Sequence, residues 1–223
     1  MIRPEDCSFV SGHLMNDGAG RNGWGVAAFL TTRDGQATPV GYELGFQSST
    51  PTNYSRTNAG ALERVGDTVW HFGNAMGVSA GIALAALDVS DPTDMRVIWD
   101  RVLRTWPVHL DASQRWMPVY LRAEGDRLYV WKNFDATSSW HCRVWDISQP
   151  MNPIPGTLLS WAIPAVWDHR GRDHHAVSRG ALYVLNPATW QVHIYNCQEP
   201  SEIVLAGNLP MPAQMHAAAR IAA

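Results

Sequence analysis

Lysine is almost absent from this chain. Lys132 is the only one, and arginine supplies nearly all of the positive charge. Charged residues of either sign make up only 17% of the 223 residues, and the formal net charge is −3. A nucleic-acid-binding surface needs an excess of basic side chains to neutralise phosphates. The composition therefore excludes nucleic acid as an expected partner.

Cysteine is also scarce, and long apolar runs are missing. The three cysteines, Cys7, Cys142 and Cys197, form no Cys-x-x-Cys pair, so they predict neither a zinc ribbon nor a complete disulfide set. No stretch approaches the roughly 18 apolar residues of a membrane span. Residues 1–6 lack the apolar core of a secretory signal. We expect synthesis in the cytoplasm, no signal peptide and no insertion into a membrane.

The chain does contain a repeat. A strand-like segment that ends in a polar turn and a proline occurs at Ile82–Pro92, at His141–Pro150 and, more weakly, at Gln191–Pro200. Two apolar runs around a short glycine-containing turn precede each copy, at 62–70, 121–130 and 176–184. Glycine supplies the positive φ of tight hairpin turns. One more apolar run follows each proline, so each unit reads as four antiparallel strands over about 50 to 60 residues.

The two ends of the chain complement one another. The segment His216–Ala223 shares the pattern H-A-x-x-R with the strand that begins at His175, and the N-terminal part supplies three more strand-like runs, at Cys7–Leu14, Gly25–Thr31 and Pro39–Leu44. A sheet shared between the termini closes a propeller and removes its exposed edges.

The sequence therefore predicts an all-β fold. We expect a small β-propeller of about four blades, each of four antiparallel strands, closed by pairing of the N- and C-terminal segments. Residues 1–223 would form a single domain with blades at approximately 54–106, 107–163, 164–210, and 211–223 together with 1–48. A β-sandwich of similar strand count and half of a larger ring formed by two copies are the alternatives.

The turn Asp146–Pro150, with a second proline at Pro153, resembles the LVIVD-type β-propeller repeat, in which a strand ends in Asp-Val-Ser-x-Pro. The turn at Asp88–Pro92 matches as well, whereas the third copy has Asn196 in place of the aspartate. The resemblance implies a fold and no particular activity, since propellers host enzymes, lectins and scaffolds. We interpret the repeated aspartates as turn residues that accept backbone N–H groups, and not as catalytic carboxylates.

Histidine is concentrated in one segment that could bind a divalent metal. The residues of this candidate site are His169, Asp173, His174 and His175, with His216 at a place equivalent to His175. Imidazole and carboxylate are usual metal ligands. Arg170 and Arg172 lie between them and oppose a cation, so a solvated loop is the alternative, and no cofactor is expected.

Two long polar segments, at 16–24 and 45–58, resemble binding loops on a rigid β scaffold. The aromatic residues to which we assign a possible binding role are Trp24, Tyr54, Trp106 and Trp116. Most of the eleven tryptophans are expected to pack between sheets.

These observations favour a non-enzymatic β-propeller that acts as a protein-interaction or structural module, such as a bacteriophage tail, fibre or capsid-decoration component. Its partners would be proteins, through self-assembly or in a larger particle such as a virion. A glycan-binding, lectin-like module is the first alternative, and a metal-dependent enzyme that uses the segment 169–175 is the second.

Overall fold

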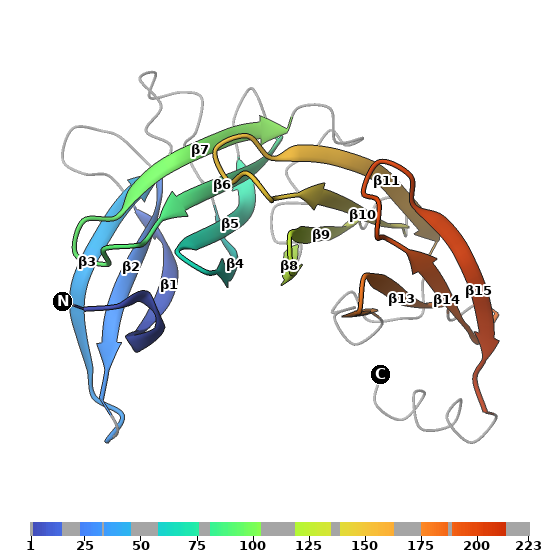
Figure 1. Ribbon diagram of the computed structural model, residues 1–223, viewed down its shortest axis with the longest axis horizontal. Helices are drawn as coiled ribbons and strands as arrows, with labels where there is room; N and C mark the ends of the chain where they lie inside the picture. Colours follow the sequence, from blue (N-terminus) through green and yellow to red (C-terminus); the bar gives the residue numbers. More distant parts are fainter. Residues whose placement is uncertain are drawn as a thin grey trace. The chain divides into compact units, whose positions relative to one another are not determined.

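The computed structural model describes residues 2–14, 23–32, 34–45, 58–75, 81–103, 119–134, 139–162, 175–186 and 189–212. These residues form fifteen β-strands and one 3-10 turn, Pro4–Asp6, and contain no α-helix. No helix in this described part is long and apolar enough to cross a membrane. The strands lie in four antiparallel sheets, which confirms the all-β prediction (Figure 1).

The four sheets follow one another along the chain, and each is a simple up-and-down meander. Sheet A contains β1 (Cys7–Leu14), β2 (Gly23–Thr31) and β3 (Ala37–Gly45). Sheet B contains β4 (Asn58–Val65), β5 (Thr68–Ala75), β6 (Gly81–Asp88) and β7 (Arg96–Leu103). Sheet C contains β8 (Val119–Glu124), β9 (Arg127–Phe134), β10 (Ser139–Asp146) and β11 (Ile154–Ala162). Sheet D contains β12 (His175–Ser178), β13 (Ala181–Asn186), β14 (Gln191–Asn196) and β15 (Val204–Pro210).

The chain divides into two compact units, which are described separately. Unit 1 comprises Met1–Leu121 and Pro150–Asn152, and it contains sheets A and B. Unit 2 comprises Arg122–Gln149 and Pro153–Ala223, and it contains sheets C and D apart from the first residues of β8.

The strand predictions agree closely with these sheets, because alternation and turn signals are local. Strand β1 covers the residues that the sequence predicts, and sheet A consists of the three strands expected from the N-terminal segment. The strand predicted at 216–223 lies outside the described residues. Among the described strands no pairing closes sheet A to a C-terminal strand, so the structure shows repeated blade-like sheets without closure.

Glycine sets the tight turns between the first two strands of sheets B, C and D. Gly66, Gly125 and Gly180 have φ values of 56°, 56° and 72°, in the left-handed region that other residues rarely adopt. This confirms the hairpin prediction from the glycine-containing turns. In sheet D, Arg179 also has a positive φ of 53°.

Each sheet carries a β-bulge in its last strand, where the pairing with the preceding strand shifts by one residue. In unit 1, a Cβ at Gly41 of β3 would lie 2.0 Å from the carbonyl oxygen of Pro92, in the turn after β6. In unit 2, a Cβ at Gly156 of β11 would lie 2.0 Å from the carbonyl oxygen of Pro200. Within each unit the turn of the second sheet thus rests on the bulge of the first, and glycine leaves room for the turn.

The core of unit 1 lies between sheets A and B. Val26 and Ala28 of β2 pack against Val69 of β5 and against Ala85 and Leu87 of β6, and all five are buried. Alternate residues of these strands share a face, so the period-two pattern decides which side chains enter the core. The fully buried His71 pairs with Ala85 and therefore shares this face.

Candidate functional site

Of the residues to which the sequence assigns a possible binding or metal-ligating role, the structure describes the backbone and side chain of only one. His175 is the first residue of β12, the first strand of sheet D. Trp24 lies in β2, where the backbone alone is described. The other candidates lie outside the described residues: Tyr54, Trp106, Trp116, His169, Asp173, His174 and His216. The structure therefore leaves these binding and metal assignments as predictions.

His175 lies against an aromatic partner from sheet C. Its ring centroid is 5.6 Å from that of Trp131 in β9, with the two ring planes tilted by 36°. His175 is half-buried and its Nε2 atom is inaccessible to solvent, whereas Trp131 is almost fully buried. Backbone pairing with Val184 holds His175 at the end of its strand. The pair places an imidazole beside a flat apolar surface, directly after the segment that contains His169, Asp173 and His174.

Trp131 is a residue of this pair that sequence reasoning missed. It occupies the same place in its hairpin as Phe72 does in sheet B and Leu185 does in sheet D. A large apolar residue at this repeat position was the available signal, and it indicates packing between sheets. His175 and Trp131 are 44 positions apart, so only the pairing of sheets C and D brings them together.

The described tryptophans mostly stabilise the sheets, as predicted. Trp70 and Trp145 are fully buried, and Trp70 packs against the half-buried Trp99 with ring centroids 6.2 Å apart. Such pairs stabilise cores beyond the apolar area that they bury.

The repeated turn aspartates are structural, which confirms the interpretation from the sequence. The Asp88 carboxylate accepts the backbone N–H of Ser90 at 3.0 Å, and the Asp146 carboxylate accepts that of Ser148 at 2.9 Å. These hydrogen bonds are the largest cause that lowers the pKa of each carboxyl below its ordinary value. In sheet D the amide oxygen of Asn196 makes the same bond to the N–H of Gln198.

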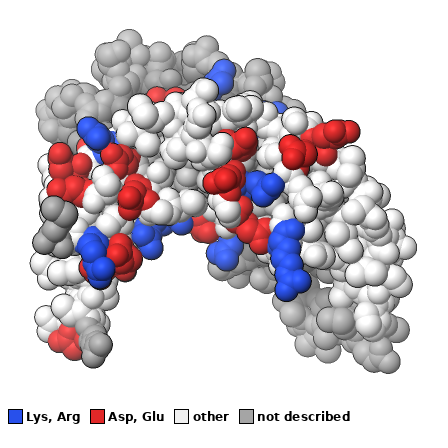
Figure 2. Space-filling model, in the orientation of Figure 1, with Lys and Arg blue, Asp and Glu red and all other residues white. Residues whose placement is uncertain are grey.

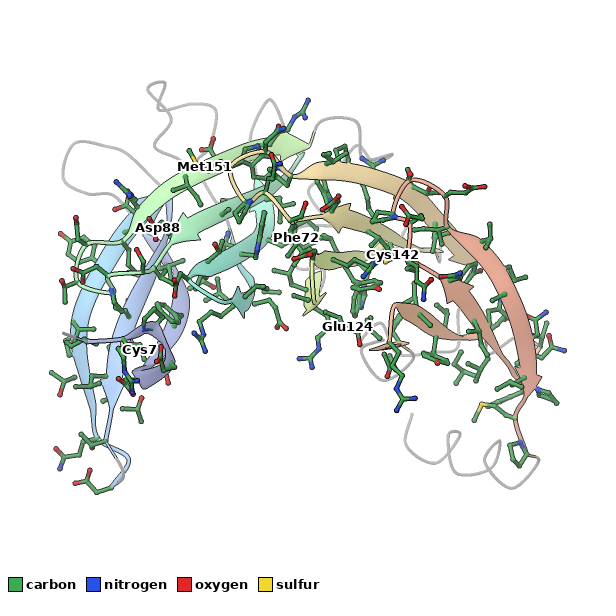
Figure 3. The ribbon with its side chains drawn as sticks, in the orientation of Figure 1. Cys7, Phe72, Asp88, Glu124, Cys142 and Met151 are labelled. Carbon is green, nitrogen blue, oxygen red and sulfur yellow. The ribbon has the colours of Figure 1, made fainter. Side chains whose placement is uncertain are left out.

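Within unit 2, a carboxylate from sheet C hydrogen-bonds to the positive-φ turn of sheet D. Glu124, at the end of β8, accepts the N–H of Arg179 on one oxygen and that of Gly180 on the other, the latter at 2.7 Å (Figure 3). The guanidinium of Arg127 donates to the carbonyl oxygen of Gln198 in the next turn. These contacts satisfy backbone groups of sheet D, so we assign them to stability and not to catalysis.

The thiols of Cys142 and Cys197 are both buried, and each interacts electrostatically with the Tyr129 hydroxyl (Cys142 is labelled in Figure 3). Burial raises the pKa of Cys142 well above its ordinary value and that of Cys197 to about 11. Burial likewise raises the pKa of the Tyr129 hydroxyl. Only a thiolate is an effective nucleophile or metal ligand, so neither thiol serves as a catalytic nucleophile near neutral pH.

The surface charges of the described part are mixed. Figure 2 shows acidic and basic side chains beside one another on the visible face, without a large region of one sign there. Arg96 pairs with Asp88 at 3.1 Å as one example. Within the described residues, no group of three histidine, cysteine, aspartate or glutamate side chains is placed to hold a metal ion. The only predicted metal ligand that is described, His175, therefore has no such group around it in this part of the chain.

No known family model and no curated protein matches the chain. The LVIVD-type repeat is therefore not shown, and the likeness is to solved structures alone. A Lactobacillus plantarum protein is 12% identical over 94% of this chain with a TM-score of 0.50, and the match spans only 58% of that protein. A Bacteroides fragilis protein provisionally named 6-phosphogluconolactonase is 8% identical, covering 94% of this chain and 69% of its own, with a TM-score of 0.39. The periplasmic gluconolactonase of Pseudomonas aeruginosa is 10% identical, covering 93% of this chain and 68% of its own, with a TM-score of 0.38.

These comparisons correct the functional expectation. The interpretation as a non-enzymatic virion module is corrected, because none of these similar structures is named as a virion component and two carry lactonase names. They give no support to a glycan-binding module either. The lack of a catalytic motif does not indicate a structural role, because a fold of this kind hosts many activities without a shared motif. At identities this low the likeness shows the fold alone, and that fold is propeller-like.

Proposed function

We propose that the chain is an enzyme whose site is built around His175 at the start of β12. The observation that carries the proposal is the half-buried imidazole held against the indole of Trp131. Imidazole is the side chain best suited to accept and return a proton near neutral pH. The buried indole of Trp131 packs against this imidazole and holds its orientation.

The reaction that we propose is hydrolysis of a sugar lactone. His175 would accept a proton from water as the water oxygen adds to the lactone carbonyl carbon. The ring C–O bond then breaks, and the proton passes to the departing ring oxygen to give the open hydroxy acid. Sugar lactones are the first substrates to assay because the Bacteroides fragilis and Pseudomonas aeruginosa proteins are named as lactonases. The proposal itself rests on His175 and Trp131.

The metal site predicted from the sequence belongs to the same proposal. His169, Asp173 and His174 directly precede His175, and together with His216 they supply the donor types that a divalent ion prefers. Such an ion would polarise a lactone carbonyl. Metal analysis of protein purified without chelator tests this part, and protein without a stoichiometric ion would contradict it.

Two finer points of the fold are also proposals. The first is that 1–223 is one domain of LVIVD-type repeats with the blade boundaries given above. The second is that the segment 216–223 adds a fourth strand beside β1. Deleting residues 216–223 should expose the edge of sheet A and cause aggregation or a lower melting temperature. Unchanged melting and solubility would contradict the pairing.

The activity is tested by following acid release from glucono-1,5-lactone. We expect H175Q to lower kcat/KM by about a hundredfold or more, since general base catalysis contributes on the order of 10²–10⁴. W131L should also lower kcat/KM, because the indole that orients the His175 imidazole is lost. H193Q is the matched control, because His193 is a half-buried histidine of the same sheet that packs against Tyr195. Equal activity of H175Q and wild type, or no hydrolysis above the uncatalysed rate, would overturn the proposal.

A further inference from the structure

We propose that a second copy of this chain packs its sheet A against sheet D, so that copies associate head to tail. The two faces involved continue the packing that joins sheet A to sheet B in unit 1 and sheet C to sheet D in unit 2. The inference rests on the repeat and on exposed apolar side chains, and it is independent of the proposed activity.

The outward face of sheet D, opposite the face that meets sheet C, is built like a face that meets a further sheet. In unit 2, the residues of sheet C that face sheet D are all buried: Tyr129, Trp131, Cys142 and Val144. The register of the hairpins places an apolar residue at each corresponding position of sheet D: Tyr183, Leu185, Val192 and Ile194. These four are only half-buried, and Leu209, which pairs with Val192, is 55% exposed.

The outward face of sheet A is the complementary half. In unit 1, the residues of sheet B that face sheet A are fully buried: Val69, His71, Ala85 and Leu87. The corresponding positions of sheet A, on the side away from sheet B, are Ser8, Val10, Ala27 and Phe29. Val10 is 53% exposed, and Tyr42, which pairs with Ala27 and so shares its face, is 73% exposed. Large apolar side chains at this exposure favour a covered surface.

The bulge of β15 supports the same conclusion. Gly207 pairs beside its bulge as Gly41 does in β3. A Cβ at Gly41 would strike the turn of the following sheet, whereas a Cβ at Gly207 meets no described atom within 4 Å. Sheet D therefore keeps the glycine that accommodates a following turn, and among the described residues no turn fills that place. The turn between β2 and β3 of a second copy is the equivalent element.

The occupant that we infer is this chain itself, because one copy carries both halves of the interface and both are exposed. An interface between two different faces is heterologous, and it forms a closed ring when the rotation between copies permits, or a filament otherwise. In this arrangement residues 216–223 of one copy would pair with β1 of the next copy, which replaces the single-chain blade of 211–223 and 1–48.

Sedimentation equilibrium of the full chain gives the first test. A monomer has a mass of 24.7 kDa, and we expect a concentration-dependent mass of two or more chains. A monomer at all concentrations up to about 100 μM overturns the proposal, because it places the Kd of any self-association above that concentration. That result would favour closure by the chain's own sheet A or a partner of another kind.

Single-face variants give the sharper test. Y42D blocks the face of sheet A, and L209D blocks the face of sheet D, so each alone should raise the dissociation constant at least about tenfold. V10D is the second variant for sheet A, and M151D is the control, because Met151 is 71% exposed on a turn outside both faces. A mixture of Y42D and L209D should associate again, since the intact sheet D of the first meets the intact sheet A of the second. Self-association of L209D alone at wild-type strength, or failure of the mixture to associate while circular dichroism shows folded variants, would overturn the proposal.

Discussion

Replacing Gly156 by alanine tests the packing of one sheet's turn on the bulge of the sheet before it. The new Cβ would lie 2.0 Å from the carbonyl oxygen of Pro200 and 2.6 Å from that of Val144. Both atoms belong to the backbone, so no flexible side chain can move aside. Overpacking of this kind costs about 1–3 kcal/mol, occasionally more, and the rigid neighbours place this variant at the upper end. For a chain of this size about 3 kcal/mol corresponds to a fall in melting temperature of roughly 6–12 °C.

The repeat provides its own comparison. G41A should destabilise unit 1 similarly, because its Cβ would lie 2.0 Å from the carbonyl oxygen of Pro92 and 3.1 Å from the Cα of Thr93. G207A adds the same methyl group at the corresponding bulge, where no described atom lies within 4 Å, and should change stability by no more than about 0.5 kcal/mol.

The three alanine variants should be compared by scanning calorimetry and urea unfolding, at a dilution where the protein is monomeric. If the units unfold in separate transitions, G41A should shift one transition and G156A the other. Equal melting temperatures for all three variants, or a loss for G207A as large as for G156A, would refute the steric argument.

Three further predictions concern titratable groups. Burial lowers the pKa of His71 from 6.5 to about 3, so the unfolded chain binds one more proton than the folded chain between these pH values. The stability should therefore fall by up to about 1.4 kcal/mol per pH unit as the pH drops through that window. H71V installs the residue that the other three sheets carry at this position, and it should flatten the profile of urea midpoints against pH. The pKa values of Asp88 and Asp146 lie below the ordinary 3.8, so both carboxylates stabilise the fold above that pH, and this stabilisation is lost as the pH falls through the lowered values. The double variant D88N/D146N should keep the hydrogen bonds of the turns, as Asn196 does. It should lose less stability than wild type between pH 5 and pH 2. At pH 8 the native protein should react with a thiol reagent through at most one of its three cysteines, because Cys142 and Cys197 are buried and protonated. All three cysteines should react in denaturant. Rapid reaction of three thiols in the native protein would contradict this prediction.

The features of the fold that the sequence predicts are those set by local chemistry. Strand β1 begins and ends where alternation predicts, the turn glycines have the positive φ that their position demands, and Asp88 bonds to the second residue after it. The bulge opposite Ala28 and Phe29 was not predicted, because it depends on how two strands pair and not on the composition of either.

The candidate site was largely beyond sequence reasoning. The contact between Trp131 and His175 depends on two hairpins meeting, as does the bond from Gly180 to Glu124 across 56 positions. The cluster from His169 to His175 drew attention because its residues are adjacent in the chain, yet the partner seen in the structure comes from another sheet. Function was misjudged for a related reason: repeats and turns determine a scaffold, and chemistry is added to a scaffold by a few side chains.

The glycine bulge and the proline turn have a consequence for how such a chain can evolve. In sheets B and D the turn rests on the strand before it, and β3 and β11 carry the glycine that receives such a turn. A pair of neighbouring sheets that brings both the glycine and the turn, A with B or C with D, is a self-contained building block. Duplication or loss of one block within the gene would leave the remaining junctions matched, so the number of sheets can change in whole steps while the sequence of each one drifts.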